Sequence, residues 1–281
     1  MAAHGRQPVR RRWRPLEREL RESIGPHIAG VDEVGRGPLA GPVVACAVIM
    51  PPDVRAIRGV DDSKRLVAAQ RSMLAARIRE RAVSWALGAA SVREIERLNI
   101  YHATTLAMSR ALGRLAVRPD HVIIDGRPIR ALDVPHTAVV GGDGCCYSVA
   151  CASILAKVAR DRAMAALARR YPAYRWERNV GYATPAHLGG LMEHGLTPHH
   201  RRTFMRVRQV AEGADASGKP GTAPGGLVFE VDLLRAAIAD ADQIADSAGT
   251  GDARTTDADE FAAAEASDLY DVLVDLRQGR L

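Results

Sequence analysis

The chain has 281 residues, 47% of them hydrophobic and 4% aromatic, which is enough for one sizeable core or for one domain with extensions. No run of about 18 apolar residues occurs, which excludes a membrane-spanning helix, and the Arg-rich start lacks the apolar stretch of a secretory signal. The net charge of +6 hides an asymmetry, because residues 212–281 carry 15 acids and 5 bases (net −10) and residues 1–211 carry 34 bases and 18 acids (net +16).

This charge distribution favours a polyanionic partner such as nucleic acid. An arginine-heavy composition without such a partner would give the same bulk numbers, so both interpretations stay open here. The four cysteines form no CxxC pair and have no histidines at zinc-ligand spacing, so they indicate buried thiols in a reducing compartment. They are Cys46, Cys145, Cys146 and Cys151. We expect a cytoplasmic protein, with a transit peptide as the alternative reading of the Arg-rich start.

Strands and helices alternate from residue 27 onward, whereas residues 1–26 are basic, show little periodicity and are expected to be mostly flexible. The first expected elements are strands at 27–34 and 42–50, a helix at 63–81 with Ser63 as N-cap, a strand at 82–90, and helices at 92–98 and 102–116. The later ones are strands at 121–125 and 136–140, a long buried helix at 145–170, and short helices at 185–194 and 201–211. Residues 27–211 therefore predict an α/β domain.

The composition changes after residue 211. Residues 212–226 are rich in Gly, Ala, Pro and Ser, which is typical of a linker. Residues 227–281 are rich in Ala and Asp, with scattered apolar residues. We expect the whole acidic tail, 212–281, to be weakly helical or disordered.

Four acidic residues stand out because of their positions in this pattern. Asp32 lies inside an apolar strand, and Glu33 follows it directly. Asp125 ends the strand at 121–125, and Asp143 lies just before the long helix. Carboxylates at strand ends converge at one edge of a sheet, where their oxygens can hold a hard cation. Because a buried unpaired carboxylate is costly, Asp32 requires a metal ion, a partner or a shifted pKa.

Each of these acids has a purely structural alternative, as a turn residue or a helix cap. Asp143 in particular suits the N-cap of the long helix. Adjacent strand residues point to opposite faces, so Asp32 and Glu33 cannot both reach one site from a regular strand. We therefore expect the strand to end or bulge at Glu33, which Gly35 and Gly37 would allow, or Glu33 to contribute its backbone carbonyl.

The residues after this strand suit close contact with a ligand. Gly35 and Gly37 flank Arg36, so the backbone can turn tightly and offer free N–H groups to a phosphate or a sugar hydroxyl. Lysine usage adds a second indication, because only three of the 39 lysine and arginine residues are lysine. Lys64 and Lys157 are therefore candidate contacts to a phosphate or to a carboxylate of the site, with chance retention as the alternative.

Several short motifs follow one another between about residues 27 and 208. They are Asp-Glu-Val-Gly-Arg-Gly at 32–37, Asp-Ser-Lys at 62–64, Leu-Asn-Ile at 98–100, His-Ala-Thr at 102–104, Ile-Asp-Gly at 124–126, Gly-Asp at 142–143, the stretch 148–161, Tyr-Pro-Ala-Tyr at 171–174, Asn-Val-Gly-Tyr-Ala-Thr at 179–184, His-Arg at 200–201 and Phe204. Together they resemble bacterial ribonuclease HII, the type 2 ribonuclease H family. The resemblance implies a ribonuclease H-like fold, with a central mixed β-sheet flanked by helices and a helical C-terminal part.

The resemblance also implies roles for particular residues. The catalytic, metal-binding acids of the family fall on Asp32, Glu33, Asp125 and Asp143, with Mg²⁺ or Mn²⁺ as the cofactor. Its loop that recognises the ribose 2′-hydroxyl falls on Gly35, Arg36 and Gly37. Its sugar-stacking tyrosine falls on Tyr182. Asp161 is also a motif residue, but its spacing from Lys157 indicates a helix surface pair outside the metal shell.

The implied function is endonucleolytic hydrolysis of the RNA strand of RNA–DNA hybrids, with cleavage on the 5′ side of single ribonucleotides in duplex DNA. Two divalent ions would carry the reaction, which leaves 5′-phosphate and 3′-hydroxyl ends. The expected partners are these nucleic acids, with no membrane, and the expected state is a monomer. The acidic tail either docks a protein partner, competes with nucleic acid for the basic face, or has no role. The roughly 26 residues before the catalytic strand are too few for the N-terminal domain of type 3 enzymes. Two alternatives stay open: a DNA-cutting metal nuclease of the same superfamily, and a non-catalytic nucleic-acid-binding protein.

Overall fold

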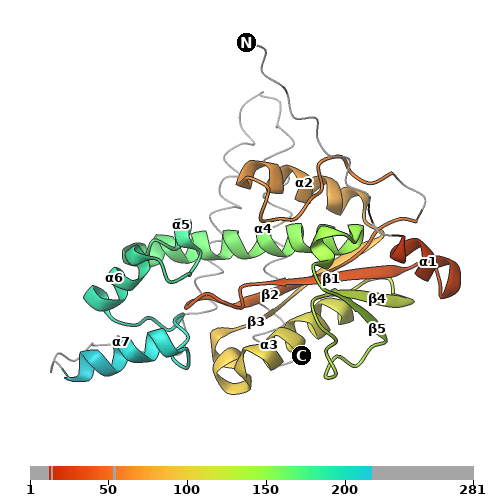
Figure 1. Ribbon diagram of the computed structural model, residues 1–281. Coiled ribbons are helices and arrows are strands. Elements are labelled where there is room, and N and C mark those ends of the chain that lie inside the picture. The colour runs from red at the N-terminus through yellow and green to blue at the C-terminus, as the bar shows by residue number, and fades with distance from the viewer. Residues whose placement is uncertain (1–12, 14, 53–54, 217–281) are drawn as a thin grey trace, which may run out of the picture.

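The computed structural model describes residues 13, 15–52 and 55–216, which form a β-sheet with helices on both faces (Figure 1). Residues 1–12 and 217–281 lie outside the described residues. The expectations for the flexible start and for the acidic tail therefore concern, for the most part, segments that the structure does not describe.

Five strands form one mixed sheet in the order β3-β2-β1-β4-β5. They are β1 Ile28–Val34, β2 Val43–Ile49, β3 Ser84–Ala90, β4 His121–Asp125 and β5 His136–Val139. β1, β2 and β3 pair antiparallel, whereas β1 with β4 and β4 with β5 pair parallel. The five expected strands are confirmed, and β1 has an antiparallel neighbour on one side and a parallel one on the other.

The helices cover the two faces of the sheet and extend beyond one end of it. They are α1 Leu16–Ser23, α2 Ala68–Arg81, α3 Val92–Gly113, α4 Tyr147–Arg170, α5 Trp176–Asn179, α6 Pro185–His194 and α7 Met205–Ala216, with 3₁₀ turns at Gly142–Gly144 and Pro172–Tyr174. None of the helices in the described part of the chain is long and apolar enough to cross a membrane. The expected mixed sheet with flanking helices and a helical C-terminal part is confirmed.

The alternation of side chains along the strands divides the core into two layers. Val44, Cys46 and Val48 of β2 pack with α2 and α4, and the intervening residues such as Val43 and Ala45 pack with α3. Figure 1 shows α2 and α4 on one side of the sheet and α3 on the other. Because both faces are covered, every residue of β2 is buried.

The expected helix at 63–81 begins later than the sequence pattern indicated. Ser63 does not act as the N-cap of α2, because Val67 holds that position. The Ser63 hydroxyl instead lies in the core, 2.9 Å from the hydroxyl of Ser153 on α4. The Asp62 carboxylate accepts the N–H of Lys64 (2.9 Å), and this turn keeps the segment out of the helix.

Part of the segment before residue 27, which was expected to be mostly flexible, forms the helix α1. α1 packs its Glu17 against the start of α4, where the Glu17 carboxylate accepts hydrogen bonds from the backbone N–H and the hydroxyl of Ser148, each at 2.8 Å. Glu17 is 7% exposed, and sequence periodicity gave no sign that this acid is buried.

Other helix boundaries also differ from the sequence prediction. The two helices expected at 92–98 and 102–116 are a single α3 with a kink at Asn99, whose φ of 67° interrupts the helical backbone. The Asn99 side chain accepts the N–H of Tyr101 (2.9 Å) and so caps the second half. α7 begins four residues after the expected start at 201 and continues past residue 211 to Ala216. The expected domain boundary at 211/212 therefore falls within a helix.

Candidate active site

The parallel pairing of β1 and β4 brings Asp32 and Asp125 side by side. The last paired residues are Val31 and Ile124, so the next residue of each strand is one of these carboxylates. Asp32 is 5% exposed and faces α4, whose Ser153 hydroxyl hydrogen-bonds to it. Two acids that are distant in the sequence therefore meet at the same end of the sheet.

Asp143 is attached to this pair through the turn before α4. The N–H of Gly142 donates to Oδ1 of Asp125 at 2.7 Å, and Asp143 follows directly in the 3₁₀ turn. Gly141 has a φ of +69°, a left-handed conformation that glycine adopts without strain. The alternative role of Asp143 as N-cap of α4 is wrong, because Cys146 holds that position. Asp143 is instead buried beside Asp125, at 6% exposed.

Glu33 contradicts the expectation that the strand ends or bulges there. β1 stays in regular register with β2 through Val34, so Asp32 and Glu33 do alternate. The Glu33 N–H donates to Oδ1 of Asp32 (2.8 Å), and the Glu33 carboxylate lies 3.1 Å from Nη1 of Arg36. The end of the sheet nevertheless leaves Glu33 close enough for its charge to act on Asp32 and Asp125.

The carboxylates at this end of the sheet share an excess of negative charge. Burial raises the pKa of Asp32 well above its ordinary value, and the neighbouring Glu33 and Asp125 raise it further. Burial also raises the pKa of Asp125, and Asp143 adds to that rise against the hydrogen bond from Gly142. The pKa of Glu33 is raised by burial despite the contact with Arg36. A cation placed among these groups would relieve both burial and repulsion.

The donor set fits a hard divalent cation, since it consists of carboxylate oxygens at a buried strand end. In the described residues, however, no group of three or more His, Cys, Asp or Glu side chains is already arranged to hold a metal ion. Two of the four acids have cationic partners instead, because Lys64 pairs with Asp143 and Arg36 with Glu33. Each of these two cations offsets the charge of the carboxylate that it contacts.

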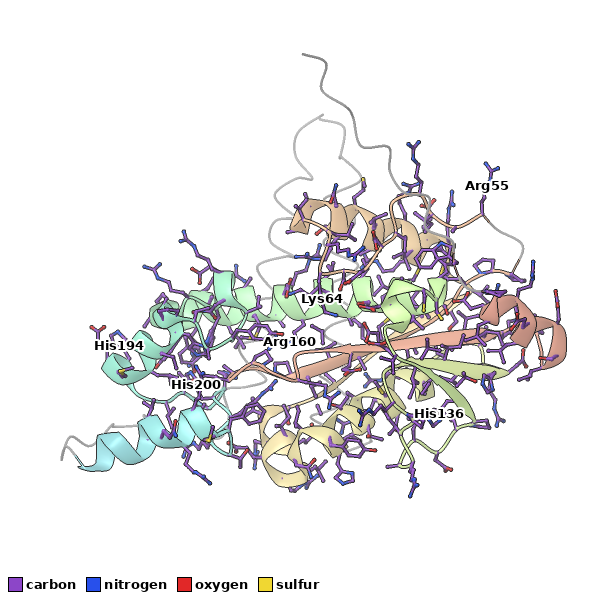
Figure 2. The ribbon with its side chains drawn as sticks, viewed as in Figure 1. Arg55, Lys64, His136, Arg160, His194 and His200 are labelled. Carbon is purple, nitrogen blue, oxygen red and sulfur yellow. The ribbon has the colours of Figure 1, made fainter. Side chains whose placement is uncertain are left out.

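Lys64 lies at this site, as the lysine pattern indicated. Its Nζ is 3.3 Å from Oδ2 of Asp143. Burial alone would lower the pKa of Lys64, but the Asp143 carboxylate outweighs burial and the pKa is raised. Figure 2 shows Lys64 and Arg160 on the side of the sheet that carries α4.

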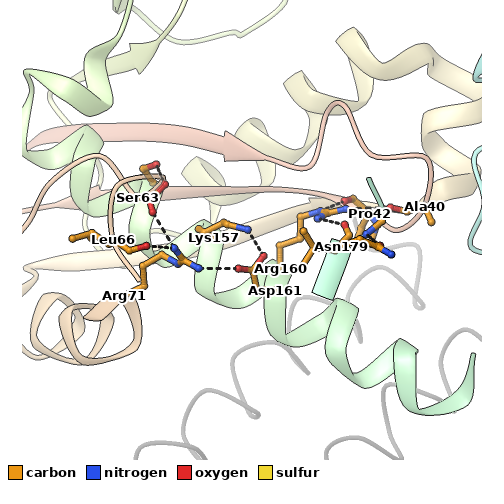
Figure 3. Close-up of polar contacts among 12 residues, drawn as sticks. Ala40, Pro42, Ser63, Leu66, Arg71, Lys157, Arg160, Asp161 and Asn179 are labelled. Carbon is orange, nitrogen blue, oxygen red and sulfur yellow. Dashed lines mark hydrogen bonds and ion pairs between the residues drawn. The ribbon is translucent and has the colours of Figure 1, made fainter. Parts of the chain in front are cut away.

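Lys157 has a different partner, the predicted Asp161 one turn along α4. Asp161 also pairs with Arg71 at 3.6 Å, and Arg71 donates to the carbonyl of Ser63 at 3.1 Å (Figure 3). The ion pair expected between Lys157 and Asp161 is confirmed, and it braces α4 against the segment that carries Lys64. A phosphate contact by Lys157 stays a prediction.

The loop after β1 lies beside Tyr182. Gly35 has a φ of +94°, and a Cβ atom there would lie 2.1 Å from Nε of Arg160, so no side chain fits. A Cβ atom on Gly37 would lie 3.5 Å from the ring of Tyr182, which is 47% exposed. The N–H of Leu39 donates to the carbonyl of Gly181 at 2.7 Å. The predicted sugar-reading loop and the predicted sugar-stacking ring therefore form one surface.

Sequence reasoning missed two arginines under this loop. Arg160 and Arg201 are each 0% exposed and donate to backbone carbonyls of residues 35–42. The available signal was the apolar face of α4, on which Arg160 occupies a core position between apolar residues. Arg201 belongs to the His-Arg motif at 200–201, to which no role was given.

A buried histidine pair connects the C-terminal segment to Tyr182. The N–H of Thr197 donates to Nδ1 of His200 (2.9 Å), so the His200 proton lies on Nε2, 3.0 Å from Nε2 of His187. His187 then carries its proton on Nδ1, which donates to the Tyr182 carbonyl at 2.9 Å. Trp176 also donates to Nε2 of His187 (3.0 Å), and this agrees with the same tautomers.

The sequence matches a family model described as Ribonuclease HII over residues 29–208. A ribonuclease HII from Granulibacter bethesdensis is 56% identical over 199 residues, covering 69% of this chain and 89% of its own length. One from Thermosynechococcus vestitus is 57% identical over 180 residues, covering 64% of this chain and 84% of its own. The family match covers the five strands almost completely and includes all four acids.

Solved structures share the fold. The crystal structure of ribonuclease H2 from Pyrococcus horikoshii OT3 has a TM-score of 0.58 at 25% identity and covers 66% of this chain and 97% of its own. The crystal structure of Bst-RNase HIII in complex with Mn²⁺ has a TM-score of 0.56 at 20% identity, covers 69% of this chain and 72% of its own, and supports the fold alone. The chain therefore belongs to the ribonuclease HII family and is a metal-dependent endoribonuclease.

Proposed function

We propose that the protein hydrolyses the RNA strand of RNA–DNA hybrids and cuts duplex DNA on the 5′ side of a single embedded ribonucleotide, leaving 5′-phosphate and 3′-hydroxyl ends. One observation carries this proposal: the acids near the ends of β1 and β4, buried Asp32 and half-buried Asp125, adjoin the segment that continues into the loop at 35–37 beside Tyr182. A cation-binding strand end and a sugar-reading surface then share one segment of chain. Hydrolysis next to a recognised ribose requires that arrangement.

Asp32, Glu33, Asp125 and Asp143 would hold the metal ions, with Mg²⁺ or Mn²⁺ as the species that suit oxygen ligands. When bound, a pair of such ions activates a water molecule and stabilises the leaving 3′-oxygen. The raised pKa values of Asp32, Asp125 and Glu33 support this assignment, because burial and then the neighbouring carboxylates disfavour the charged forms, and a bound cation would offset both effects. The relative solved with Mn²⁺ has the same fold.

The remaining residues bind and orient the substrate. The free N–H groups of the loop at 35–37 would meet the ribose 2′-hydroxyl, the group that distinguishes RNA from DNA. The exposed Tyr182 ring would stack on the neighbouring sugar. Lys64, with a side chain that is 76% exposed, can turn from Asp143 to a phosphate once cations neutralise that carboxylate. Lys157 is the second proposed phosphate contact.

The test is cleavage of matched 5′-labelled duplexes by the full-length chain with Mg²⁺ or Mn²⁺. The duplexes are all-DNA, DNA with one ribonucleotide, and an RNA–DNA hybrid. We expect cuts on the 5′ side of the lone ribonucleotide and along the RNA strand, with the all-DNA duplex intact. Cleavage of an all-DNA junction would instead favour a DNA nuclease, and binding without any cleavage would favour a binding protein.

Two carboxylate variants show whether the cleavage belongs to this site. Asp32→Asn should abolish cleavage and leave duplex binding intact, because it removes a ligand and keeps the shape. Asp120→Asn is the matched control, since Asp120 lies just before β4, at the end opposite Asp125, where its carboxylate accepts the N–H of His27 at 2.8 Å. Equal loss in both variants would contradict the assignment.

Three further predictions accompany this function. All four cysteines are free thiols, which agrees with the proposed cytoplasmic location. We also propose that the protein acts as a monomer and that the acidic tail at 212–281 meets a separate protein partner or the basic body of the same chain. Gel filtration with light scattering tests whether the protein is a monomer. Binding assays with truncated protein test what the acidic tail binds.

A further inference from the structure

Two fully buried arginines lie beneath the loop at 35–42, and neither forms an ion pair with a carboxylate of the described residues. Arg160 comes from α4 and Arg201 from the segment before α7, and each is 0% exposed. Burying a cation without a counter-charge is costly, so other interactions, here hydrogen bonds to backbone carbonyls, must offset the cost. Burial lowers the pKa of Arg160 to about 10 and that of Arg201 to about 9. Both side chains still carry their charge at neutral pH.

Arg201 holds the carbonyl groups of the loop on its inner side. Its Nη1 donates to the carbonyl of Arg36 at 2.9 Å, and its Nη2 donates to that of Gly35. Nε and Nη2 also donate to the carbonyl of Gly41, at 3.0 and 2.8 Å. The planar guanidinium thus fixes both ends of the loop with a single side chain.

This clamp determines where the loop N–H groups point. In a trans peptide the carbonyl and the following N–H point in opposite directions. Because the carbonyls of Gly35 and Arg36 point inward to Arg201, the N–H groups of Arg36 and Gly37 point outward. Neither N–H donates to an acceptor elsewhere in the described part of the chain. Two free donors therefore face the surface on which Tyr182 lies.

Arg160 connects this loop to the turn before Tyr182. Its Nε and Nη2 donate to the carbonyls of Pro42 (2.9 Å) and Ala40 (3.1 Å), as Figure 3 shows. Its Nη1 donates to the carbonyl of Val180 at 2.9 Å. Val180 has a φ of 44°, which a β-branched residue rarely adopts, so this turn conformation must be stabilised by contacts from outside the turn. One side chain therefore sets the distance between the loop and the tyrosine.

We propose that Arg160 and Arg201 are positioning residues for ribonucleotide recognition: they hold the loop at 35–37 and the turn at 180–182 in one fixed arrangement, with two N–H groups directed at the 2′-hydroxyl. This inference rests on the proposed function. A lysine in either place keeps the charge, but its donors sit on one compact ammonium group and lack the planar fork that reaches several separate carbonyls. The selectivity for ribose should therefore depend on the guanidinium fork rather than on the positive charge.

The test compares Arg160→Lys and Arg201→Lys with a matched control, Arg110→Lys, in the full-length chain. Arg110 on α3 is 7% exposed, donates to the carbonyl of Ala89 at 2.7 Å and pairs with Glu94 at 2.8 Å, without a bond to the loop or the turn. Variants whose circular dichroism spectrum matches that of the parent are folded, and for these kcat and KM are measured on the single-ribonucleotide duplex. The inhibition constant of an all-DNA duplex competitor measures binding without a 2′-hydroxyl.

Both loop variants should lose about 10- to 100-fold in kcat/KM, while the inhibition constant of the all-DNA competitor changes less than about threefold. Arg110→Lys should lower the melting temperature and leave both constants near those of the parent. Unchanged kcat/KM in the folded loop variants would overturn the inference, and so would equal losses of kcat/KM and competitor binding. A parent chain that cuts no ribonucleotide duplex would refute the proposed function instead.

A second measurement needs no variant and covers the case in which the lysine variants do not fold. Hydrogen exchange of the Arg36 and Gly37 amides is followed in the unaltered chain. Both should exchange rapidly in the free protein, and a ribonucleotide-containing duplex should slow them more than an all-DNA duplex. Amides that are already protected in the free protein would overturn the inference, because the loop would then not present them.

Discussion

The charge of Asp32 opposes the stability of the fold. Its carboxylate is buried among other carboxylates, and the pKa is raised by burial first and by Glu33 and Asp125 next. A raised carboxylate pKa means that the charged form is less favourable in the folded state than in the unfolded chain. At neutral pH and without a cation, Asp32 therefore destabilises the protein.

Asp32→Asn should raise the melting temperature of the metal-free protein. Removal of one buried charge should stabilise the fold by on the order of 1 kcal/mol, or roughly 2–4 °C for a domain of this size. Differential scanning calorimetry in EDTA measures this shift, with Asp120→Asn as the exposed control. Added Mn²⁺ should then stabilise the parent more than Asp32→Asn. A lower melting temperature in EDTA would mean that Asp32 is structurally needed in its charged form.

Residues differ in how far their roles could be predicted from the sequence. The meeting of Asp32 and Asp125 at one end of the sheet was predictable, because carboxylates at strand ends converge there. Their role as metal ligands stays a prediction. The roles of Arg160 and Arg201 were not predictable, although Arg160 lies on the apolar face of α4 and Arg201 belongs to the His-Arg motif. Their roles depend on carbonyl groups that only the folded loop brings together.

At the scale of elements, α6 and the segment before α7 are joined through neutral histidines. Burial lowers the pKa of His200 to about 3, and the neighbouring His187 adds to that effect. Burial also lowers the pKa of His187. The Thr197 N–H occupies Nδ1 of His200, so a proton added there would break the chain of hydrogen bonds.

Stability should therefore fall as the pH decreases from about 6.5. Below that value the unfolded chain binds protons at His187 and His200 that the folded protein does not, so the free energy of unfolding drops by up to about 1.4 kcal/mol per pH unit for each histidine. Urea denaturation at pH 7, 6 and 5 measures the slope. His200→Asn should give a flatter profile over this window. Equal slopes for parent and variant would exclude His200 as the cause.

Boundaries were less predictable than the elements themselves. The strands followed from runs of β-branched and small apolar residues between turns. The start of α2 did not, because Ser63 resembles an N-cap in sequence but forms a hydrogen bond across the core. α1 was missed for a similar reason, since its buried Glu17 interrupts any apolar pattern.

For the molecule as a whole, the uneven distribution of charge predicts a dependence on salt. Deletion of residues 217–281 removes 13 acids and 5 bases and leaves α7 in place. If the tail competes for the basic body, duplex affinity should rise roughly 3- to 10-fold at about 50 mM salt, with a smaller gain at high salt. Fluorescence anisotropy at several salt concentrations checks this. Unchanged affinity at low salt would remove competition and favour a separate partner for the tail.

The mixed sheet has a consequence for how the enzyme is made. β1 is the first strand to leave the ribosome, yet its parallel neighbour β4 and the covering helix α4 are synthesised much later. Asp32 is therefore synthesised well before Asp125 and Asp143, and it lacks these neighbours until most of the domain has emerged. The acids that we propose as metal ligands come together only in the completed sheet, so we expect hydrolysis only after α4 has been synthesised. The time at which activity appears in a translation reaction would thus report when β4 and α4 have joined the sheet.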